Sequence, residues 1–262
     1  MSGAGNLRYC SNMTSKRVRH DVTSEVFSIA SRFRGPPRSG NGGYVCGRVA
    51  VHLPGCAAVR LKAPPTLESE LRIEVSEAGA LLMHGTNVIA EGRAAELDLA
   101  IPAIPALSEA QEAAKSFPGF QHHVFPQCFV CGPQRAPGDG LRIFPGSLAN
   151  RSVVAAPWTP EPSLGDGAGR LRPEFLWAAL DCTSAFAVLP IPEGKAIVLG
   201  ELCARIDGAV SPEETCVVVG WPLQTDGRKR LAGSAIVSSS GRPVAVARAT
   251  WIEVPASAFA GQ

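Results

Sequence analysis

The pattern of hydrophobic and polar residues in the second half of the chain predicts one long helix followed by four strands. Residues 171–188 begin with Pro173 and Glu174 and continue with a run rich in Ala and Leu, which favours a helix. Because apolar residues occupy nearly every side of this segment, we expect the helix to be buried. Strands are predicted before it at 140–144 and 152–157, and after it at 196–206, 216–221, 231–238 and 243–253.

The first half shows a similar order with shorter elements. A strand is predicted at 24–33, and the loop at 34–43 is too rich in Gly and Pro to be a helix or a central strand. Residues 44–53 end at a Pro-Gly pair and are either a short helix or a buried strand, because short apolar runs are ambiguous. Further strands are predicted at 57–62, 71–76, 80–84 and 87–97.

Similar segments recur in the two halves. Residues 87–94 match 242–249 as the last strand of each half, and residues 71–75 match 216–220 earlier in each half. Such repetition predicts an α+β chain made of two related units. We place the first unit at residues 21–101 and the second at 127–262. The linker, 102–126, contains four prolines and a helical patch at 108–115, and residues 1–20 form a loose tail.

Composition and charge exclude several classes of protein. The chain has 262 residues, of which 45% are hydrophobic and 18% charged, as in a globular protein. A net charge of +2 implies no nucleic-acid or membrane-surface partner. No apolar run approaches the ~20 residues of a membrane span, and the first residues do not resemble a secretory signal. Eight cysteines in a chain of this length do not form a disulfide scaffold, so we expect a cytoplasmic protein.

Two motifs in the second half suggest a family. The run Cys-Phe-Val-Cys-Gly-Pro at 128–133, followed by Gly-Leu-Arg-Ile-Phe at 140–144, resembles the opening of hotdog acyl-CoA thioesterases similar to those of phenylacetate degradation. The resemblance implies two tandem hotdog folds, each an antiparallel sheet wrapped around a central helix. It further implies that the substrate is a small-molecule acyl thioester, and that two such chains could pair as a homodimer.

The family often carries His-Gly-Gly before the helix and Leu-Ala-Asp near its middle, and each half of this chain keeps only part of that pattern. In the first half Asn-Gly-Gly at 41–43 fills the glycine place, but Ala50 stands where the acid belongs. In the second half Ala-Leu-Asp at 179–181 supplies the acid, while Arg-Pro-Glu at 172–174 replaces the glycines. The two losses therefore fall on different parts of the motif.

The chemistry of thioester hydrolysis requires a carboxylate and N–H donors at one carbonyl group. The family's glycine precedes its acid by about eight residues, about 12 Å along one helix, so the site must be shared between two antiparallel helices. This predicts one complete site, with the amides of Gly42 and Gly43 as oxyanion hole and Asp181 as base or nucleophile. A separation of about 6 to 8 Å between the carboxylate and these amides, across an open pocket, would support a shared site, whereas a filled apolar gap would favour a structural role for Asp181. The second possible site would combine the start of the second helix with the middle of the first. There Pro173 has no N–H and Ala50 has no carboxylate.

Other residues are predicted to contact the substrate. Asn41 and Tyr44 flank the two glycines, and Arg38 and Arg172 lie in the loops before the two helices, where they could bind coenzyme A phosphates. Thr183 and Ser184 could orient a water, or could bond back to helix carbonyls. A structural role also stays open for Asp181, and a simple turn for 41–43.

A run of histidines and cysteines has part of the pattern of a metal site. His122, His123, Cys128 and Cys131 form a His-His-x4-Cys-x2-Cys run, and such side chains suit tetrahedral zinc. The second Cys-x2-Cys of a firm zinc site is absent, so we assign no metal ligand and no cofactor.

Three functions therefore remain in order of preference. The first is hydrolysis of an acyl thioester, carried by coenzyme A or an acyl-carrier protein, at one composite site. The second is non-catalytic binding of acyl-CoA or a hydrophobic ligand. The third is a hotdog dehydratase or hydratase, which would need a His with an acid; none of the five histidines matches that motif.

Overall fold

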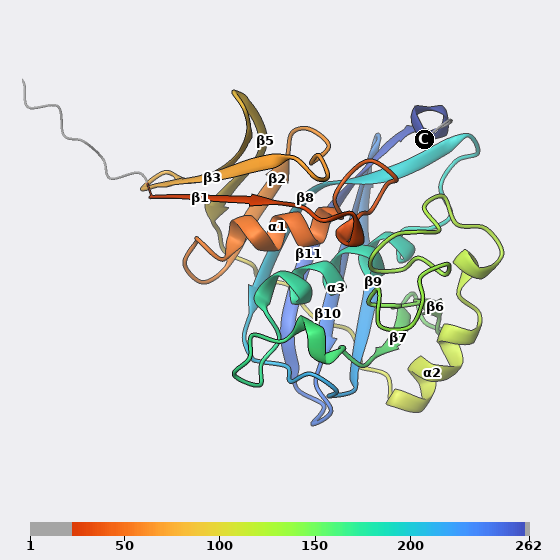
Figure 1. Cartoon of the computed structure of the whole chain (residues 1–262). Coiled ribbons are helices and arrows are strands. Elements are labelled where there is room, and N and C mark those ends of the chain that lie inside the picture. Colours follow the sequence, from red (N-terminus) through yellow and green to blue (C-terminus); the bar gives the residue numbers. More distant parts are fainter. Residues whose placement is uncertain (1–22, 260–262) are drawn as a thin grey trace, which may run out of the picture.

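A computed structural model describes residues 23–259, and within them the chain forms one antiparallel sheet of eleven strands (Figure 1). The tail predicted at 1–20 lies outside the described residues. In the order of the sheet the strands are β1 (Thr23–Ser28), β3 (Glu70–Ser76), β4 (Gly79–His84), β5 (Asn87–Ala94), β2 (Ala57–Leu61), β8 (Lys195–Ile206), β11 (Pro243–Pro255), β10 (Lys229–Val237), β9 (Cys216–Asp226), β7 (Val154–Trp158) and β6 (Gly146–Ser147).

The order of the strands is the same on both sides of the junction between β2 and β8. Outward from the junction the sheet runs β2-β5-β4-β3-β1 on one side and β8-β11-β10-β9-β7 on the other. The junction itself is an antiparallel pair in which Ala58 faces Cys203. Each side also has one helix directly before its junction strand in the chain, α1 (Gly42–Ala50) before β2 and α3 (Pro173–Phe186) before β8.

The two helices α1 and α3 lie side by side on one face of the sheet (Figure 1). Asn41 directly precedes helix α1, and its side-chain oxygen caps the helix by accepting a hydrogen bond from the Tyr44 N–H at 2.9 Å. Helix α3 has Pro173 in its first turn with Glu174 beside it, and nearly all its residues are buried, as its composition predicts.

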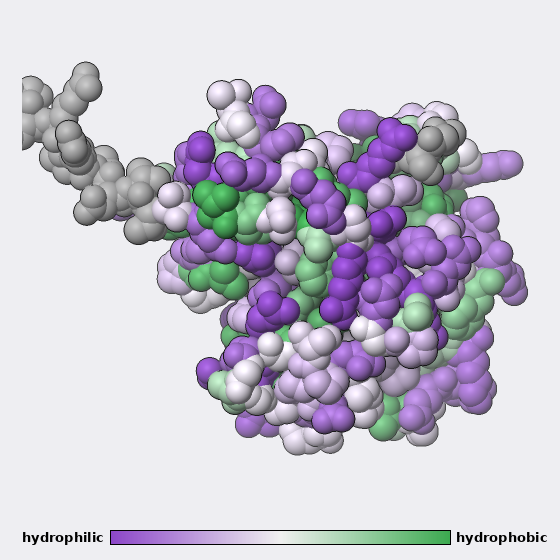
Figure 2. Space-filling model, viewed as in Figure 1, coloured by the Kyte–Doolittle hydropathy of each residue, from purple (hydrophilic) through white to green (hydrophobic). Residues whose placement is uncertain are grey.

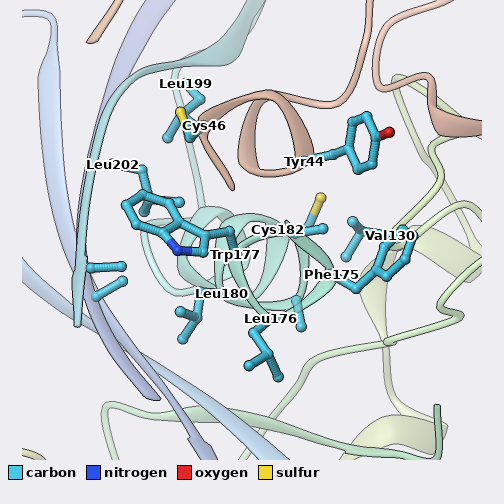
Figure 3. Packing of buried hydrophobic residues seen from close by; sticks show 14 of the residues in the cluster. Tyr44, Cys46, Val130, Phe175, Leu176, Trp177, Leu180, Cys182, Leu199 and Leu202 are labelled. Carbon is cyan, nitrogen blue, oxygen red and sulfur yellow. The ribbon is translucent and has the colours of Figure 1, made fainter. Parts of the chain in front are cut away.

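Two hydrophobic clusters lie on opposite faces of the sheet. The larger cluster contains Leu176 and Leu180 of α3 together with Leu199 and Leu202 of β8 (Figure 3). The smaller cluster lies under α2 (Leu107–Lys115), a helix within the segment predicted as a linker. Successive residues of β9 alternate between the two clusters, as the pleat of a strand requires. Strand β9 therefore belongs to the core on both of its faces.

Most predicted elements are present, with several differences. The ambiguous segment 44–53 contains the helix α1, which the Asn41 cap starts. Because α1 begins at Gly42, the prediction that 34–43 contains no helix is wrong at its last two residues. The strand predicted at 24–33 ends at Ser28 and is followed by a 3-10 turn at Ser31–Phe33. The strand predicted at 140–144 is wrong: this segment donates backbone hydrogen bonds to the turn at Phe129 and Val130 instead of joining the sheet.

The surface is mainly hydrophilic on the side shown in Figure 2, where hydrophobic residues form small scattered patches. Among the described residues, no helix is long and apolar enough to cross a membrane. All seven cysteines in this part of the chain are free thiols.

The crossing of α1 and α3 depends on two glycines of α1. A Cβ atom on Gly47 would lie 2.5 Å from Glu174 Cα, and one on Gly43 would lie 2.4 Å from Asp181 Cβ. Neither distance is possible for a real side chain, and both neighbours belong to the body of α3. The two helices can therefore approach this closely only because both positions are glycine.

We predict that Gly47→Ala lowers the free energy of unfolding by about 1–3 kcal/mol, because overpacking the crossing outweighs the gain of about 1 kcal/mol in helix propensity. Urea denaturation followed by circular dichroism measures the change. Val51→Ala, at the end of the same helix where Val51 is 46% exposed, is the matched control and should shift stability by no more than about 0.5 kcal/mol. Equal effects of the two substitutions would contradict the close crossing.

Candidate active site

Asp181 lies in the middle of α3, and its carboxylate faces the N-terminus of α1. It is 2% exposed, and its Oδ2 accepts hydrogen bonds from the Asn41 side-chain amide at 2.8 Å and the Gly43 N–H at 2.9 Å. Its Oδ1 is also buried but has no hydrogen-bond partner within residues 23–259. One oxygen of the carboxylate is thus held by protein groups, and the other is buried without a partner in this part of the chain.

The protein environment changes the acidity of Asp181. Burial raises the pKa of Asp181 to about 7, and negative charge at Cys128 acts in the same direction. The hydrogen bonds from the Gly43 N–H and the Asn41 amide oppose this change, because they stabilise the ionised form. Both protonation states of Asp181 are therefore populated near neutral pH.

The first N–H groups of α1 have different partners. The Gly43 N–H donates to Asp181 and the Tyr44 N–H donates to Asn41 Oδ1. The Gly42 N–H has no acceptor in the described part of the chain. Since the N-terminal end of a helix carries partial positive charge, Gly42 offers a free donor to an electron-rich ligand atom.

A cavity of about 830 Å³ lies next to these groups. Its wall contains Asn41 and Gly42 of α1 and Asp181 of α3, together with segments of 35–40, 61–65, 122–131 and 189–199. Most of its other lining residues are apolar, among them Leu61, Phe186, Leu189, Ile197, Leu199 and Trp251. Its size and its few polar groups are those of a site for a small organic ligand.

Three cationic side chains line the same cavity: Arg38, Lys62 and Lys195. All three are exposed, and Lys62 is paired with Glu91 at 2.9 Å. The structure thus brings Arg38 to the cavity with Asp181, as the sequence predicts. The sequence gives no sign of Lys62 and Lys195, because they come from strand ends far from the motif.

Four predicted substrate contacts do not line this cavity: Tyr44, Arg172, Thr183 and Ser184. Arg172 packs over the ring of Phe175 and lies 3.8 Å from a carboxylate oxygen of Glu174. The Tyr44 ring stacks on Phe33, with 4.5 Å between the ring centroids, and its hydroxyl accepts from Arg48. Neighbouring side chains therefore hold Arg172 and Tyr44 away from the cavity.

Thr183 and Ser184 bond back to their own helix, which is the second of the two roles expected for them. The Thr183 hydroxyl donates to Ala179 O at 3.3 Å, and that of Ser184 donates to Asp181 O at 2.6 Å. Ser184 Oγ also accepts from Trp251 Nε1 at 2.9 Å. These contacts position the helical backbone at Asp181, and neither residue lines the cavity.

The separation of about 6 to 8 Å that would support a shared site is not found between Asp181 and the Gly43 amide. The two groups are directly hydrogen-bonded at 2.9 Å. The absence of a side chain at Gly43 lets the two helices touch at this point. The pocket lies beside this contact, and Gly42 lines it.

Three cysteines gather near Asp181, and the sequence pattern indicates only two of them. The sulfurs of Cys128, Cys131 and Cys182 lie within 4.8 Å of one another, and all three residues line the cavity. Cys182 escapes the pattern because it is about fifty residues from the Cys-x2-Cys pair in the chain, and only the fold joins them. Its position directly after Asp181 is the one signal that the sequence offers.

Comparison with known proteins gives the fold. No protein-family profile and no curated protein sequence matches the chain. The tesB protein of Mycobacterium avium subspecies paratuberculosis superposes on 90% of it, over 96% of that chain, with a TM-score of 0.59 and 12% identity. A conserved protein of unknown function with hot dog fold from Alicyclobacillus acidocaldarius matches 89% of this chain and 95% of its own, with a TM-score of 0.56 and 11% identity. The chain has the hotdog fold.

An acyl-CoA thioesterase II from Mycobacterium marinum has the same hotdog architecture. It covers 90% of this chain and 96% of its own, with a TM-score of 0.56 and 14% identity. The predicted resemblance to hotdog proteins is confirmed over nearly the whole described chain. At these identities the likeness concerns the fold, and the chemistry of this hotdog chain has to be argued from its own residues.

The Asn41 side chain caps α1 and also donates a hydrogen bond to Asp181. Two substitutions separate these roles. We predict that Asn41→Ala lowers the free energy of unfolding by about 2 kcal/mol or more, because it removes the cap and one donor to Asp181. Asn41→Ser keeps a capping oxygen but is too short to reach Asp181, so it should recover about 1 kcal/mol. Denaturant unfolding of both variants measures the difference. Equal losses would show that Asn41 does not cap α1.

Proposed function

We propose that this hotdog chain hydrolyses an acyl thioester at one composite site between α1 and α3. The observation that carries the proposal is the arrangement around Asp181. Asp181, whose Oδ1 is unpaired within the described residues, and Gly42, whose N–H is free there, come from different helices, and both residues line one apolar cavity. A buried carboxylate and an N–H donor beside an apolar cavity are the groups that thioester hydrolysis needs.

In the proposed reaction the acyl chain occupies the cavity and the thioester carbonyl oxygen accepts from the Gly42 N–H. Asp181 Oδ1 takes a proton from a water, whose oxygen attacks the carbonyl carbon. The tetrahedral oxyanion is stabilised by Gly42 at the positive end of α1. The carbon–sulfur bond then breaks, and the leaving thiolate takes the proton from Asp181. Direct attack by Oδ1, through an anhydride later opened by water, is the second form of this mechanism.

We further infer that the chain consists of two tandem hotdog units, residues 21–101 and 127–262, joined by 102–126. The identical strand order on the two sides of the β2–β8 junction supports this division. A second site would combine the start of α3 with the end of α1. There Pro173 has no N–H and Ala50 has no carboxylate. Only the site between the start of α1 and the middle of α3 therefore has the groups that hydrolysis needs.

Coenzyme A is the carrier that the edge of the cavity fits best. Its phosphates carry negative charge, and Arg38 and Lys195 are exposed cations on the cavity wall. The free thiols of the described residues support a reducing compartment such as the cytoplasm for this activity.

The bond between Gly43 and Asp181 favours one alternative, a protein that binds acyl-CoA without cleaving it. This bond occupies one of the two amides expected to serve the oxyanion. In such a protein the acid would only hold α1 against α3. Measurement of both hydrolysis and binding in one variant distinguishes the two functions.

We predict that Asp181→Asn lowers kcat/KM for acyl-CoA hydrolysis by at least about 100-fold, the range of a lost general base. The Asn side-chain oxygen can still accept from Gly43 and Asn41, so the fold and acyl-CoA binding should persist in calorimetry. The matched control is Glu174→Gln, since Glu174 is a buried acid of the same helix that does not line the cavity. Unchanged turnover in Asp181→Asn, or wild-type protein that binds acyl-CoA without cleaving it, would contradict hydrolysis at Asp181.

A second prediction concerns the carrier. The double variant Arg38→Glu, Lys195→Glu should raise KM for acyl-CoA by about tenfold or more at low salt, because two attractive charges become repulsive. The difference should shrink at high salt. Lys229→Glu with Arg242→Glu makes the same change of charge at exposed positions away from the cavity and should leave KM unaltered. A KM that does not respond to the first pair would indicate that the phosphates lie elsewhere.

A further inference from the structure

A cluster of sulfur atoms lies beside the proposed site, and thioester hydrolysis does not use it. Cys128, Cys131 and Cys182 are 3%, 3% and 7% exposed, and their sulfurs all lie within 4.8 Å of one another. Cys128 and Cys182 approach to 3.6 Å. Sulfurs bound about 2.3 Å from one tetrahedral zinc ion lie about 3.8 Å apart, so the cluster has nearly the size that such an ion requires.

The chain builds a tight turn around the first two of these sulfurs. Gly132 N–H donates to Cys128 O at 2.9 Å and closes the turn. A Cβ on Gly132 would lie 2.5 Å from that oxygen, so only glycine fits.

Helix α3 supplies the third sulfur from a distant part of the chain. Figure 3 shows Cys182 projecting from α3 on the side of α1 and Val130. Chain segments more than fifty residues apart thus bring three thiols of the hydrophobic core to one point. A single disulfide would use two of the sulfurs and leave the third unexplained.

His123 supports this cluster without being a fourth ligand. Its Nδ1 accepts from the Phe125 N–H at 3.0 Å, so the ring proton belongs on Nε2. Nε2 lies 3.3 Å from the Cys131 sulfur, to which it therefore donates. An N–H donor to a ligating sulfur is the kind of supporting contact that orients metal ligands.

We propose that Cys128, Cys131 and Cys182 bind one zinc ion through three thiolates, with the fourth coordination position open to the cavity. Three sulfur ligands favour a soft ion such as zinc over magnesium or calcium. An iron–sulfur cluster needs four protein ligands, and the group within 4.8 Å in the described residues has three. Since all three cysteines line the cavity, a water or a ligand can complete the coordination.

The ion would fasten the turn at 128–132 to α3 one residue beyond Asp181. It would therefore fix one wall of the cavity independently of whether thioesters are hydrolysed there.

The test uses the untagged full-length protein, purified without chelators from cells grown with zinc. Elemental analysis should find about one zinc per chain. Cobalt substituted for zinc should give strong thiolate-to-cobalt absorption, which identifies sulfur ligands. The matched pair of variants is Cys182→Ala and Cys216→Ala, because Cys216 is also buried but lies on β9 outside the cluster. Cys182→Ala should lose the metal and Cys216→Ala should keep it.

The wild-type protein decides the question even if Cys182→Ala fails to fold. Absence of bound metal, or a Cys128–Cys182 disulfide found by mass spectrometry of the native protein, would overturn the proposal. His123→Gln should keep one zinc per chain and bind it about 10–100-fold more weakly in a chelator competition. Complete loss of zinc in this variant would overturn the three-thiolate assignment.

Discussion

The close contact between α1 and α3 is the constraint on which the site depends. Gly43 and Gly47 lack the side chains that would hold the helices apart, and their missing Cβ atoms would collide with the body of α3. This contact brings the N-terminus of one helix to the middle of the other. An acid and an amide that are far apart in the chain thereby become hydrogen-bonded neighbours.

The same contact makes the two oxygens of Asp181 unequal. Oδ2 is held by Asn41 and Gly43, while Oδ1 is buried without a partner among the residues that the structure describes. Burial also raises the pKa of Asp181 to about 7, because the ionised form loses hydration that the two hydrogen bonds only partly replace. A rigid acid with one unpaired oxygen at an apolar cavity is suited to chemistry as well as to packing.

The cavity combines parts from the whole chain. The start of α1, the second half of α3, the segment 189–199 and the cysteine turn all contribute to its wall. Proteins with the same fold include some named as thioesterases, but the mycobacterial tesB protein and the Mycobacterium marinum thioesterase are only 12% and 14% identical to this chain. The chemistry of the cavity therefore follows from the residues that this chain places there.

The sequence by itself determined most of the secondary structure. Local patterns predicted the buried helix that carries Asp181, because periodicity and helix-start signals depend only on near neighbours. The roles predicted for Asp181, Gly42 and Gly43 came from the resemblance to hotdog thioesterases, since the local pattern at 41–43 favours a simple turn. Sequence patterns were wrong about the strand at 140–144 and did not indicate Cys182, because the environments of both are formed by distant segments. Only the tertiary structure decided that Gly43 bonds Asp181 directly and that three sulfurs meet, since the distance between packed elements depends on which side chains are missing at their contact.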